Sequence, residues 1–120
     1  MYSKAKSCLD QAITLKDSDS EPYYFRALLS FYKQDMLGAV PDLDLAIDKA
    51  DDNEVRHFLT RGRCYAAMRL YPEAIEEFSI VLKLDSDHTD AYYYRGCCAF
   101  EMGNQSLAFH DFQEIVEKDA

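Results

Sequence analysis

Apolar residues recur at helical spacing from the start of the chain. Between residues 2 and 16 they stand at Ala5, Leu9, Ala12, Ile13 and Leu15, with polar residues between them. Apolar positions three and four residues apart share one face of a helix, so this stretch predicts one amphipathic helix. Such a helix is stable when a neighbouring element covers its apolar face.

The same periodicity predicts six further helices. The second runs from about residue 21 to 33, with Ser20 as its cap and Pro22 in its first turn. The third begins at or after Gly38, which leaves Pro41 in the first turn, where a missing amide donor costs little. The other four are expected at about 54–68, 72–83, 89–102 and 105–117, with Pro72 in a first turn, Gly103 as a left-handed stop and Asn104 as a cap.

The pattern repeats with a period of 34 residues. Ala5 leads to Ala39 by this step, whereas the step from Ala46 to Val81 is 35, so one extra residue is expected in the loop at 51–53. In the second half of the chain, a step of 34 joins identical residues at Arg61/Arg95, Gly62/Gly96, Cys64/Cys98, Met68/Met102, Ala74/Ala108, Phe78/Phe112 and Asp85/Asp119.

The stretch from Phe58 to Phe78 has the order large, small, large and then small, large, at Phe58, Gly62, Tyr65, Ala74 and Phe78. This order resembles the tetratricopeptide repeat, a helical hairpin that meets itself through small side chains. The resemblance covers nearly the whole chain. It implies an all-α, right-handed α-solenoid of stacked antiparallel hairpins, about three and a half repeats long. Leucine at Gly62 should overpack the hairpin by about 1–3 kcal/mol.

The repeats define one domain over residues 1–120. Residues 1–19 are expected to be the second helix of a truncated repeat, followed by full repeats at 20–54, 55–88 and 89–120. Because the first helix lacks its partner, we expect the chain to be a fragment of a longer protein. The family's usual proline after the second helix is replaced by Asp17, Asp51 and Ser86.

Charge, apolar runs and cysteine spacing restrict the expected partners and the expected compartment. Net charge is −9, which disfavours nucleic acid and anionic membranes as partners. No apolar run approaches the roughly 18 residues of a membrane span, and no secretory signal precedes the first helix. The four cysteines lack any Cys-x-x-Cys spacing, so reduced thiols in the cytoplasm, or alternatively the nucleus, are expected.

No catalytic constellation is visible, so we expect no enzyme activity, no cofactor and no metal. The histidines, His57, His88 and His110, share neither a helical face nor a ligand spacing and are expected at the surface or in loops. The clusters Asp42-Asp44-Asp48 and Glu73-Glu76-Glu77 are interpreted as solvated helix faces.

An arginine recurs at one register of each full repeat, where the family pattern has leucine. An acid follows each arginine after 16 residues, in the pairs Arg26/Asp42, Arg61/Glu77 and Arg95/Asp111. Ion pairing within or between hairpins is the main interpretation, because an unpaired buried arginine costs several kcal/mol. The alternative is that these arginines face a ligand.

The resemblance implies that the first helix of each hairpin lines a concave surface. By register, its aligned residues are Tyr24/Leu59/Tyr93, Phe25/Thr60/Tyr94 and Leu28/Arg63/Cys97, with Arg56 at the rim. Apolar and aromatic residues on such a face indicate a binding site, although some of the tyrosines could instead pack between hairpins.

The predicted function is therefore a non-catalytic scaffold that binds a peptide or helix with apolar anchors and an acidic residue. One alternative is an assembly module that self-associates through uncapped apolar ends, and another is the non-catalytic part of a larger enzyme or co-chaperone. The family's clamp for acidic chaperone tails uses lysine and asparagine, which are absent from the matching registers Tyr24, Leu28, Thr60, Asp90 and Tyr94.

Overall fold

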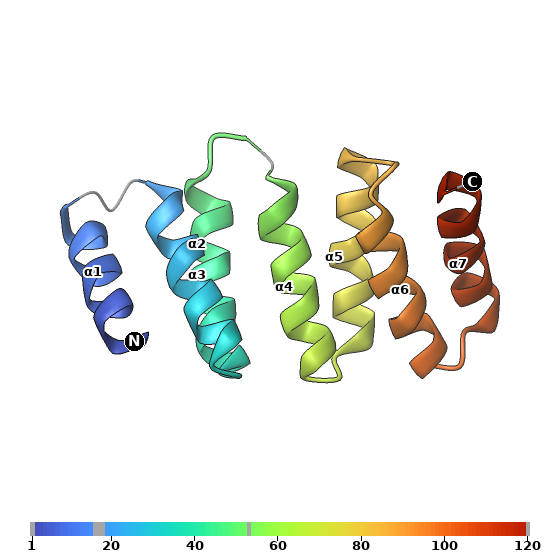
Figure 1. Ribbon diagram of the computed structural model, residues 1–120, viewed down its shortest axis with the longest axis horizontal. Helices are drawn as coiled ribbons and strands as arrows, with labels where there is room; N and C mark the ends of the chain where they lie inside the picture. The colour runs from blue at the N-terminus through green and yellow to red at the C-terminus, as the bar shows by residue number, and fades with distance from the viewer. Residues whose placement is uncertain (1, 16–18, 53, 120) are drawn as a thin grey trace. The chain divides into compact units, whose positions relative to one another are not determined.

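The computed structural model describes residues 2–15, 19–52 and 54–119, and every regular element in these ranges is an α-helix. The predicted all-α class and its seven helices are confirmed over the described residues. They are α1 (Tyr2–Leu15), α2 (Ser20–Tyr32), α3 (Met36–Lys49), α4 (Val55–Ala67), α5 (Tyr71–Leu84), α6 (Thr89–Glu101) and α7 (Gln105–Asp119) (Figure 1).

Contacts divide the chain into two compact units, residues 1–60 and 61–120. In the first unit, α2 packs against both α1 and α3. In the second unit, α6 packs against both α5 and α7. Helix α4 contributes residues 55–60 to the first unit and 61–67 to the second. The repeat boundaries expected at 20, 55 and 89 coincide with the first residues of α2, α4 and α6, and the division into repeats stays a prediction.

The turns within the hairpins share one hydrogen-bond pattern. After α2, the Gln34 N–H donates to the Phe31 carbonyl and the Asp35 N–H donates to the Ser30 carbonyl. The same two bonds recur around Arg69 and Gly103. This is the left-handed helix stop, and φ is +67° at Gln34, +63° at Arg69 and +82° at Gly103. The predicted stop at Gly103 is confirmed, as is the cap at Asn104, whose Oδ1 accepts from the Leu107 N–H at 3.3 Å.

Helix α3 begins at Met36, so the predicted start at or after Gly38 is wrong. The Asp35 side chain accepts a hydrogen bond from the Gly38 N–H at 3.0 Å and caps the helix two residues earlier than expected. Pro41 is therefore inside the helix rather than in its first turn. Its position is exposed, so water can reach the Leu37 carbonyl that proline leaves without a donor.

The connections between hairpins agree with the repeat arithmetic. The link from α3 to α4 has five residues, 50–54, whereas the link from α5 to α6 has four, 85–88. The extra residue predicted from the sequence is confirmed in this link, although Asn53 lies outside the described residues. The predicted cap of α2 is wrong, because Asp19 rather than Ser20 accepts from the Glu21 N–H, at 3.1 Å.

Small residues let the paired helices approach closely. A Cβ at Gly62 would lie 2.6 Å from the Phe78 ring, and one at Gly96 would lie 2.7 Å from the Phe112 ring. The predicted lack of space at Gly62 is therefore confirmed. The core around these contacts consists of small and apolar side chains that are fully buried, among them Ala27, Ala39, Leu43 and Ala46 in the first unit and Ala74, Phe78, Val81 and Ala91 in the second.

Candidate protein-binding site

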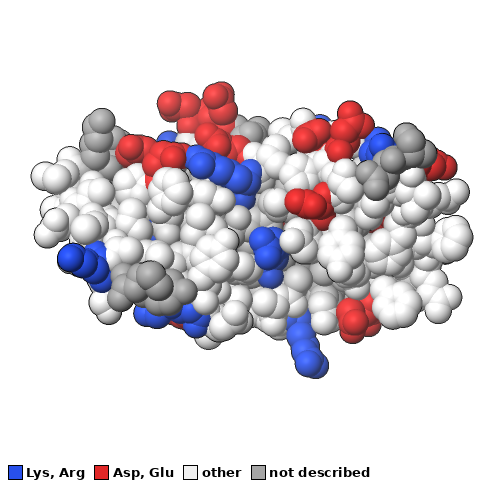
Figure 2. Space-filling view, in the orientation of Figure 1, with Lys and Arg blue, Asp and Glu red and all other residues white. Residues whose placement is uncertain are grey.

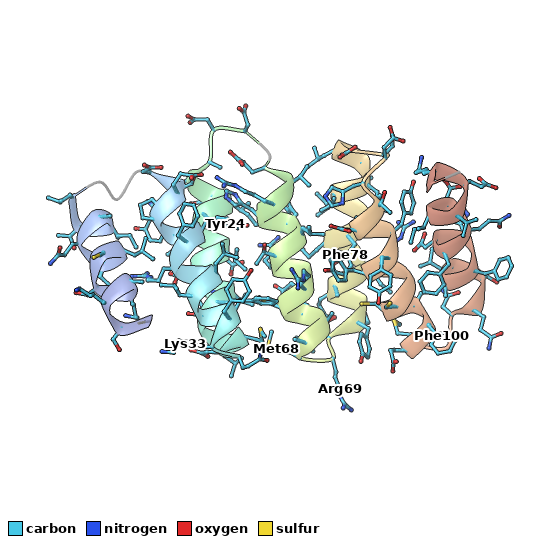
Figure 3. All side chains as sticks on the ribbon, viewed as in Figure 1. Tyr24, Lys33, Met68, Arg69, Phe78 and Phe100 are labelled. Atoms are coloured by element: carbon cyan, nitrogen blue, oxygen red, sulfur yellow. The ribbon has the colours of Figure 1, made fainter. Side chains whose placement is uncertain are left out.

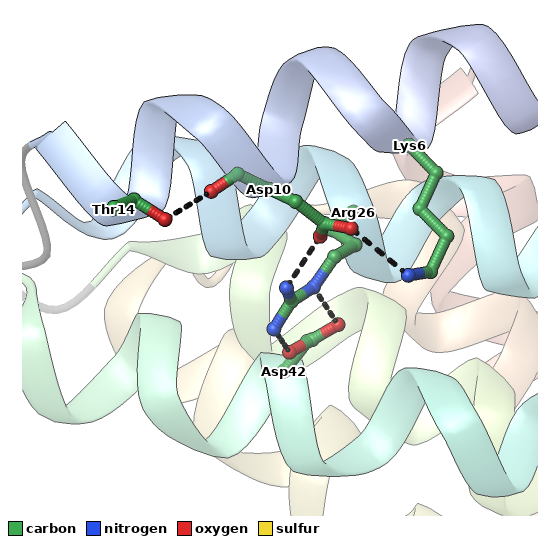
Figure 4. A network of polar contacts seen from close by, with 5 residues as sticks. All are labelled: Lys6, Asp10, Thr14, Arg26 and Asp42. Carbon is green, nitrogen blue, oxygen red and sulfur yellow. Dashed lines mark hydrogen bonds and ion pairs between the residues drawn. The ribbon is translucent and has the colours of Figure 1, made fainter.

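The recurring arginines form ion pairs that hold helices together. In the first unit, Arg26 on α2 donates through Nε and Nη2 to both carboxylate oxygens of Asp42 on α3, at 2.8 and 2.7 Å. Its Nη1 donates to Asp10 on α1 at 2.7 Å (Figure 4). One guanidinium thus joins three helices. The hydrogen bonds with Asp42 raise the pKa of Arg26, which keeps it charged.

The second unit repeats this arrangement. Arg95 on α6 donates from Nε and Nη2 to Asp111 on α7, at 2.8 and 2.7 Å, and from Nη1 to Ser79 Oγ on α5, at 3.2 Å. Arg61 Nε donates to Glu77 Oε1 at 2.8 Å. The predicted structural pairing is confirmed for all three arginines, and none of them is a candidate ligand contact.

The acidic clusters are only partly solvated. Asp42 and Glu77 are buried against their arginines, so the expectation of an entirely solvated face is wrong for these two residues. Asp44, Asp48 and Glu76 are exposed, as expected.

His57 contradicts the expectation that the histidines lie at the surface. It is fully buried, its ring lies 4.9 Å from the Tyr24 ring, and neither ring nitrogen has a hydrogen-bond partner among the described residues. Burial, followed by the charge of Arg56, lowers the pKa of His57. The sequence carried a signal for this burial, since the residue 34 positions later is Ala91, which is also buried. His88 Nδ1 caps α6 through the Ala91 N–H, while His110 is exposed.

Three of the predicted groove residues pack within the first unit. Tyr24 and Thr60 are only 8% and 6% exposed, and the Tyr24 hydroxyl lies 3.5 Å from Thr60 Oγ1. The Arg56 guanidinium lies 4.6 Å from the centre of the Tyr24 ring and forms ion pairs with Glu21 and Glu54. Tyr24 and Thr60 therefore offer little surface to a partner, and the charge of Arg56 is balanced by neighbouring carboxylates.

The exposed aromatic surface of the first unit lies on α2. Phe25 is 43% exposed, and Leu28 and Leu59 are half-buried. Tyr32, which the sequence reasoning missed, is 62% exposed. It stands seven residues after Phe25, a spacing that places both on one side of the helix, so helical periodicity could have identified it.

In the second unit, the predicted residues cluster around Tyr94. Its ring stacks on Phe78 at 5.7 Å, meets the Tyr93 ring edge-on at 5.5 Å and lies 5.0 Å from the Arg63 guanidinium carbon. Tyr94 is half-buried by these contacts, whereas Tyr93 is 53% exposed. The neighbouring Cys97 side chain raises the pKa of Tyr93, whose hydroxyl is protonated at neutral pH even at its ordinary value.

Phe100 extends this surface and was also missed. It is 63% exposed and lies near the carboxyl end of α6 (Figure 3). Tyr93, Cys97 and Phe100 follow one another at intervals of four and three residues, so they share one side of α6, which we call the α6 stripe; Tyr93 and Phe100 are exposed and Cys97 is half-buried. Figure 2 shows a largely uncharged surface over α6 and α7, and acidic side chains gathered at the link from α3 to α4.

Metal binding, reactive cysteines and membrane spans have little support in the described residues. Across residues 2–15, 19–52 and 54–119, no group of three or more His, Cys, Asp or Glu side chains could hold a metal ion. All four cysteines are free thiols, and burial raises the pKa of Cys64 and of Cys98 to about 11, which makes both unreactive near neutral pH. No helix in the described part of the chain is both long and apolar enough to cross a membrane.

No protein-family model matches the chain. Among curated proteins, it is 27% identical over 105 residues to DnaJ homolog subfamily C member 3 of Gallus gallus, a match covering 87% of this chain and 20% of that protein. It is also 29% identical over 71 residues to Hsp70-Hsp90 organizing protein 3 of Arabidopsis thaliana, covering 59% of this chain and 13% of that protein. The chain thus matches only a small part of each curated relative.

Solved structures show the same fold. A crystal structure of MamA superposes with a TM-score of 0.92 at 21% identity, covering 98% of this chain and 68% of that one. YrrB, described as a TPR protein with an unusual peptide-binding site, gives a TM-score of 0.88 at 22% identity, covering 98% and 60%. The chain therefore has the all-α helical-repeat fold of tetratricopeptide proteins, as its resemblance to them implied.

Proposed function

We propose that this helical-repeat chain is a non-catalytic protein-interaction module. It binds a peptide or short helix through the exposed face of the first helix of each hairpin, such as α2 and α6. The α6 stripe is the observation that carries the proposal. Tyr93 and Phe100 are more than half exposed on one side of a single helix, and exposed aromatic residues of this kind are typical anchors of protein interfaces. Phe25 and Tyr32 offer a similar surface on α2.

The ligand we propose has two or three large apolar anchors and one acidic residue. Tyrosine and phenylalanine rings provide broad apolar contact at low entropic cost. The acidic residue is assigned to Arg63, whose guanidinium lies over the Tyr94 ring beside the stripe. The four free thiols fit a partner in the cytoplasm, or alternatively in the nucleus.

Two of the other functions have weaker support. The name of the Arabidopsis relative links that protein to Hsp70 and Hsp90. The registers of the family's acidic-tail clamp carry no lysine or asparagine in this chain, so capture of acidic chaperone tails is disfavoured. An assembly role has a structural basis in the exposed apolar side of α7, where Phe109 is 72% and Val116 is 69% exposed.

The test is a peptide-library selection against the wild-type chain, followed by titration of selected peptides against single variants. Tyr93→Ala should weaken binding by about 2 kcal/mol or more, on the order of a hot-spot loss. Leu37→Ala is the matched control, because Leu37 is 79% exposed but stands on α3, a second helix. Equal affinity of the Tyr93→Ala and Leu37→Ala chains for every selected peptide would refute the proposal.

A further inference from the structure

An apolar groove runs along the outer side of α7. It has a volume of about 310 Å³ and is lined by Phe109, Phe112, Gln113 and Val116, which we call the α7 end face. A second groove of about 260 Å³ shares Phe109 and Phe112 and extends to Phe100 on α6. The side chains of the α7 end face lie outside the α6 stripe, whereas Phe100 belongs to the stripe and borders the second groove.

The 34-residue period identifies what the α7 end face is built to receive. A step of 34 leads from Ile75, Phe78, Ser79 and Leu82 on α5 to Phe109, Phe112, Gln113 and Val116 on α7. Helices α5 and α6 pack against each other, and Phe78, which is fully buried, and Ser79 contact α6 directly. Helix α7 thus presents the same side by which α5 holds a following helix.

Two contacts define how α6 fits on α5. One side of the Phe78 ring meets Gly62 of its own hairpin, and the ring also stacks on Tyr94 of the next helix at 5.7 Å. Beside it, Arg95 Nη1 donates to Ser79 Oγ at 3.2 Å. On α7, the Phe112 ring has its own glycine, Gly96, but borders the open groove where an aromatic ring would stack.

We propose that the α7 end face binds an amphipathic helix of a partner protein that carries an aromatic residue followed by arginine or lysine. The aromatic ring stacks on Phe112, and the neighbouring cation donates to the Gln113 side-chain carbonyl. Glu117, exposed one helical turn after Gln113, supplies a carboxylate where α5 has Lys83, so this face favours a more basic helix than α6.

A second copy of the chain fits this face less well than such a helix. Two α7 end faces in contact would bring the exposed Glu117 side chains of two chains with a net charge of −9 toward each other. The chain's own aromatic–arginine pair on α6 is already engaged, since Tyr94 stacks on Phe78 and Arg95 bonds Ser79 and Asp111.

The probe for this proposal is a peptide copy of residues 88–102, held helical by a lactam bridge on its outward side and with both cysteines replaced by alanine. It should bind the intact chain with an affinity measurable by fluorescence anisotropy. Because Phe109 and Val116 are exposed, Phe109→Glu and Val116→Glu should leave the circular dichroism spectrum unchanged and weaken binding at least about tenfold. Tyr94→Ala and Arg95→Ala in the peptide should each weaken it as well.

The matched control is His110→Glu, an exposed position about 100° around the helix from Phe109, which adds the same charge without removing an anchor. It should leave the affinity unchanged. Absence of binding at millimolar peptide, or equal losses for His110→Glu and Phe109→Glu, would overturn the proposal. So would loss of binding in the Tyr93→Ala chain alone, which would assign the peptide to the α6 stripe. A dimer that the peptide fails to dissociate would assign the face to a second copy.

Discussion

Arg95 and Asp111 are a pair of opposite charges with little solvent contact, since their side chains are 15% and 0% exposed. Removing either partner leaves the other charge buried, so Arg95→Leu and Asp111→Leu should each cost about 3–5 kcal/mol. The double variant should cost much less than the sum, with a coupling of about 0.5–3 kcal/mol in urea unfolding. The exposed pair Lys118–Asp87 is the control, with an expected coupling of about 0–1 kcal/mol. Additive losses at Arg95 and Asp111 would contradict the structural role of the pair.

His57 should make stability depend on pH. Its pKa is lowered in the folded chain, so the unfolded chain binds the proton more readily, and stability falls as pH decreases below about 6.5. The slope reaches at most about 1.4 kcal/mol per pH unit and ends at the folded pKa. Replacing His57 by leucine should remove this slope between pH 7 and 5.5, measured by urea unfolding, whereas His110→Gln at an exposed site should retain it. Parallel curves for wild type and His57→Leu would show that His57 does not titrate on unfolding.

The roles of residues could be predicted from the sequence where the same residue type recurs at one position of each repeat. They could be predicted less well where one repeat differs from the others. The ion pairs could be predicted because an acid follows each arginine after 16 residues. The burial of His57 was missed because polarity was judged at one position without reference to Ala91, its equivalent. Tyr24 was assigned to the groove by register, but Arg56 and Thr60 enclose it, and these contacts are particular to the first unit.

At the level of elements, each of the three hairpin turns has one residue in the left-handed conformation, but only one of these residues is glycine. Gln34 and Arg69 adopt the left-handed φ that Gly103 adopts, at a cost of about 1–2 kcal/mol for a residue with a Cβ. Gln34→Gly and Arg69→Gly should therefore each stabilise the chain by up to about 1 kcal/mol, and Gly103→Ala should destabilise it. Lys33→Gly, beside Gln34 at an ordinary φ of −83°, is the control and should lower the urea midpoint. A lower midpoint for both glycine variants would refute this account.

Helix positions could be predicted from periodicity, but the start of α3 could not. Gly38 and Pro41 predicted a late start for α3, because both residues disfavour the helix interior. The helix begins at Met36, because the preceding turn positions Asp35 to cap the Gly38 N–H. Pro41 is exposed, so water can reach the Leu37 carbonyl that proline leaves without a donor. The side-chain cap at Asp35, positioned by the previous turn, outweighed the low helix propensity of Gly38 and Pro41. Propensity alone does not reveal such a cap.

For the whole molecule, two opposing terms govern self-association. The exposed Phe109 and Val116 favour contact between chains, while the net charge of −9 opposes it. Salt screens the repulsion and leaves the apolar contact, with the Debye length falling from about 10 Å at 0.1 M to about 3 Å at 1 M. Sedimentation equilibrium at high micromolar concentration should show a weak dimer whose population rises with salt and disappears in Phe109→Glu. A chain that stays monomeric at every salt concentration would contradict this prediction. A dimer that dissociates as salt rises would show that charge pairing, rather than the apolar side of α7, holds the two copies together.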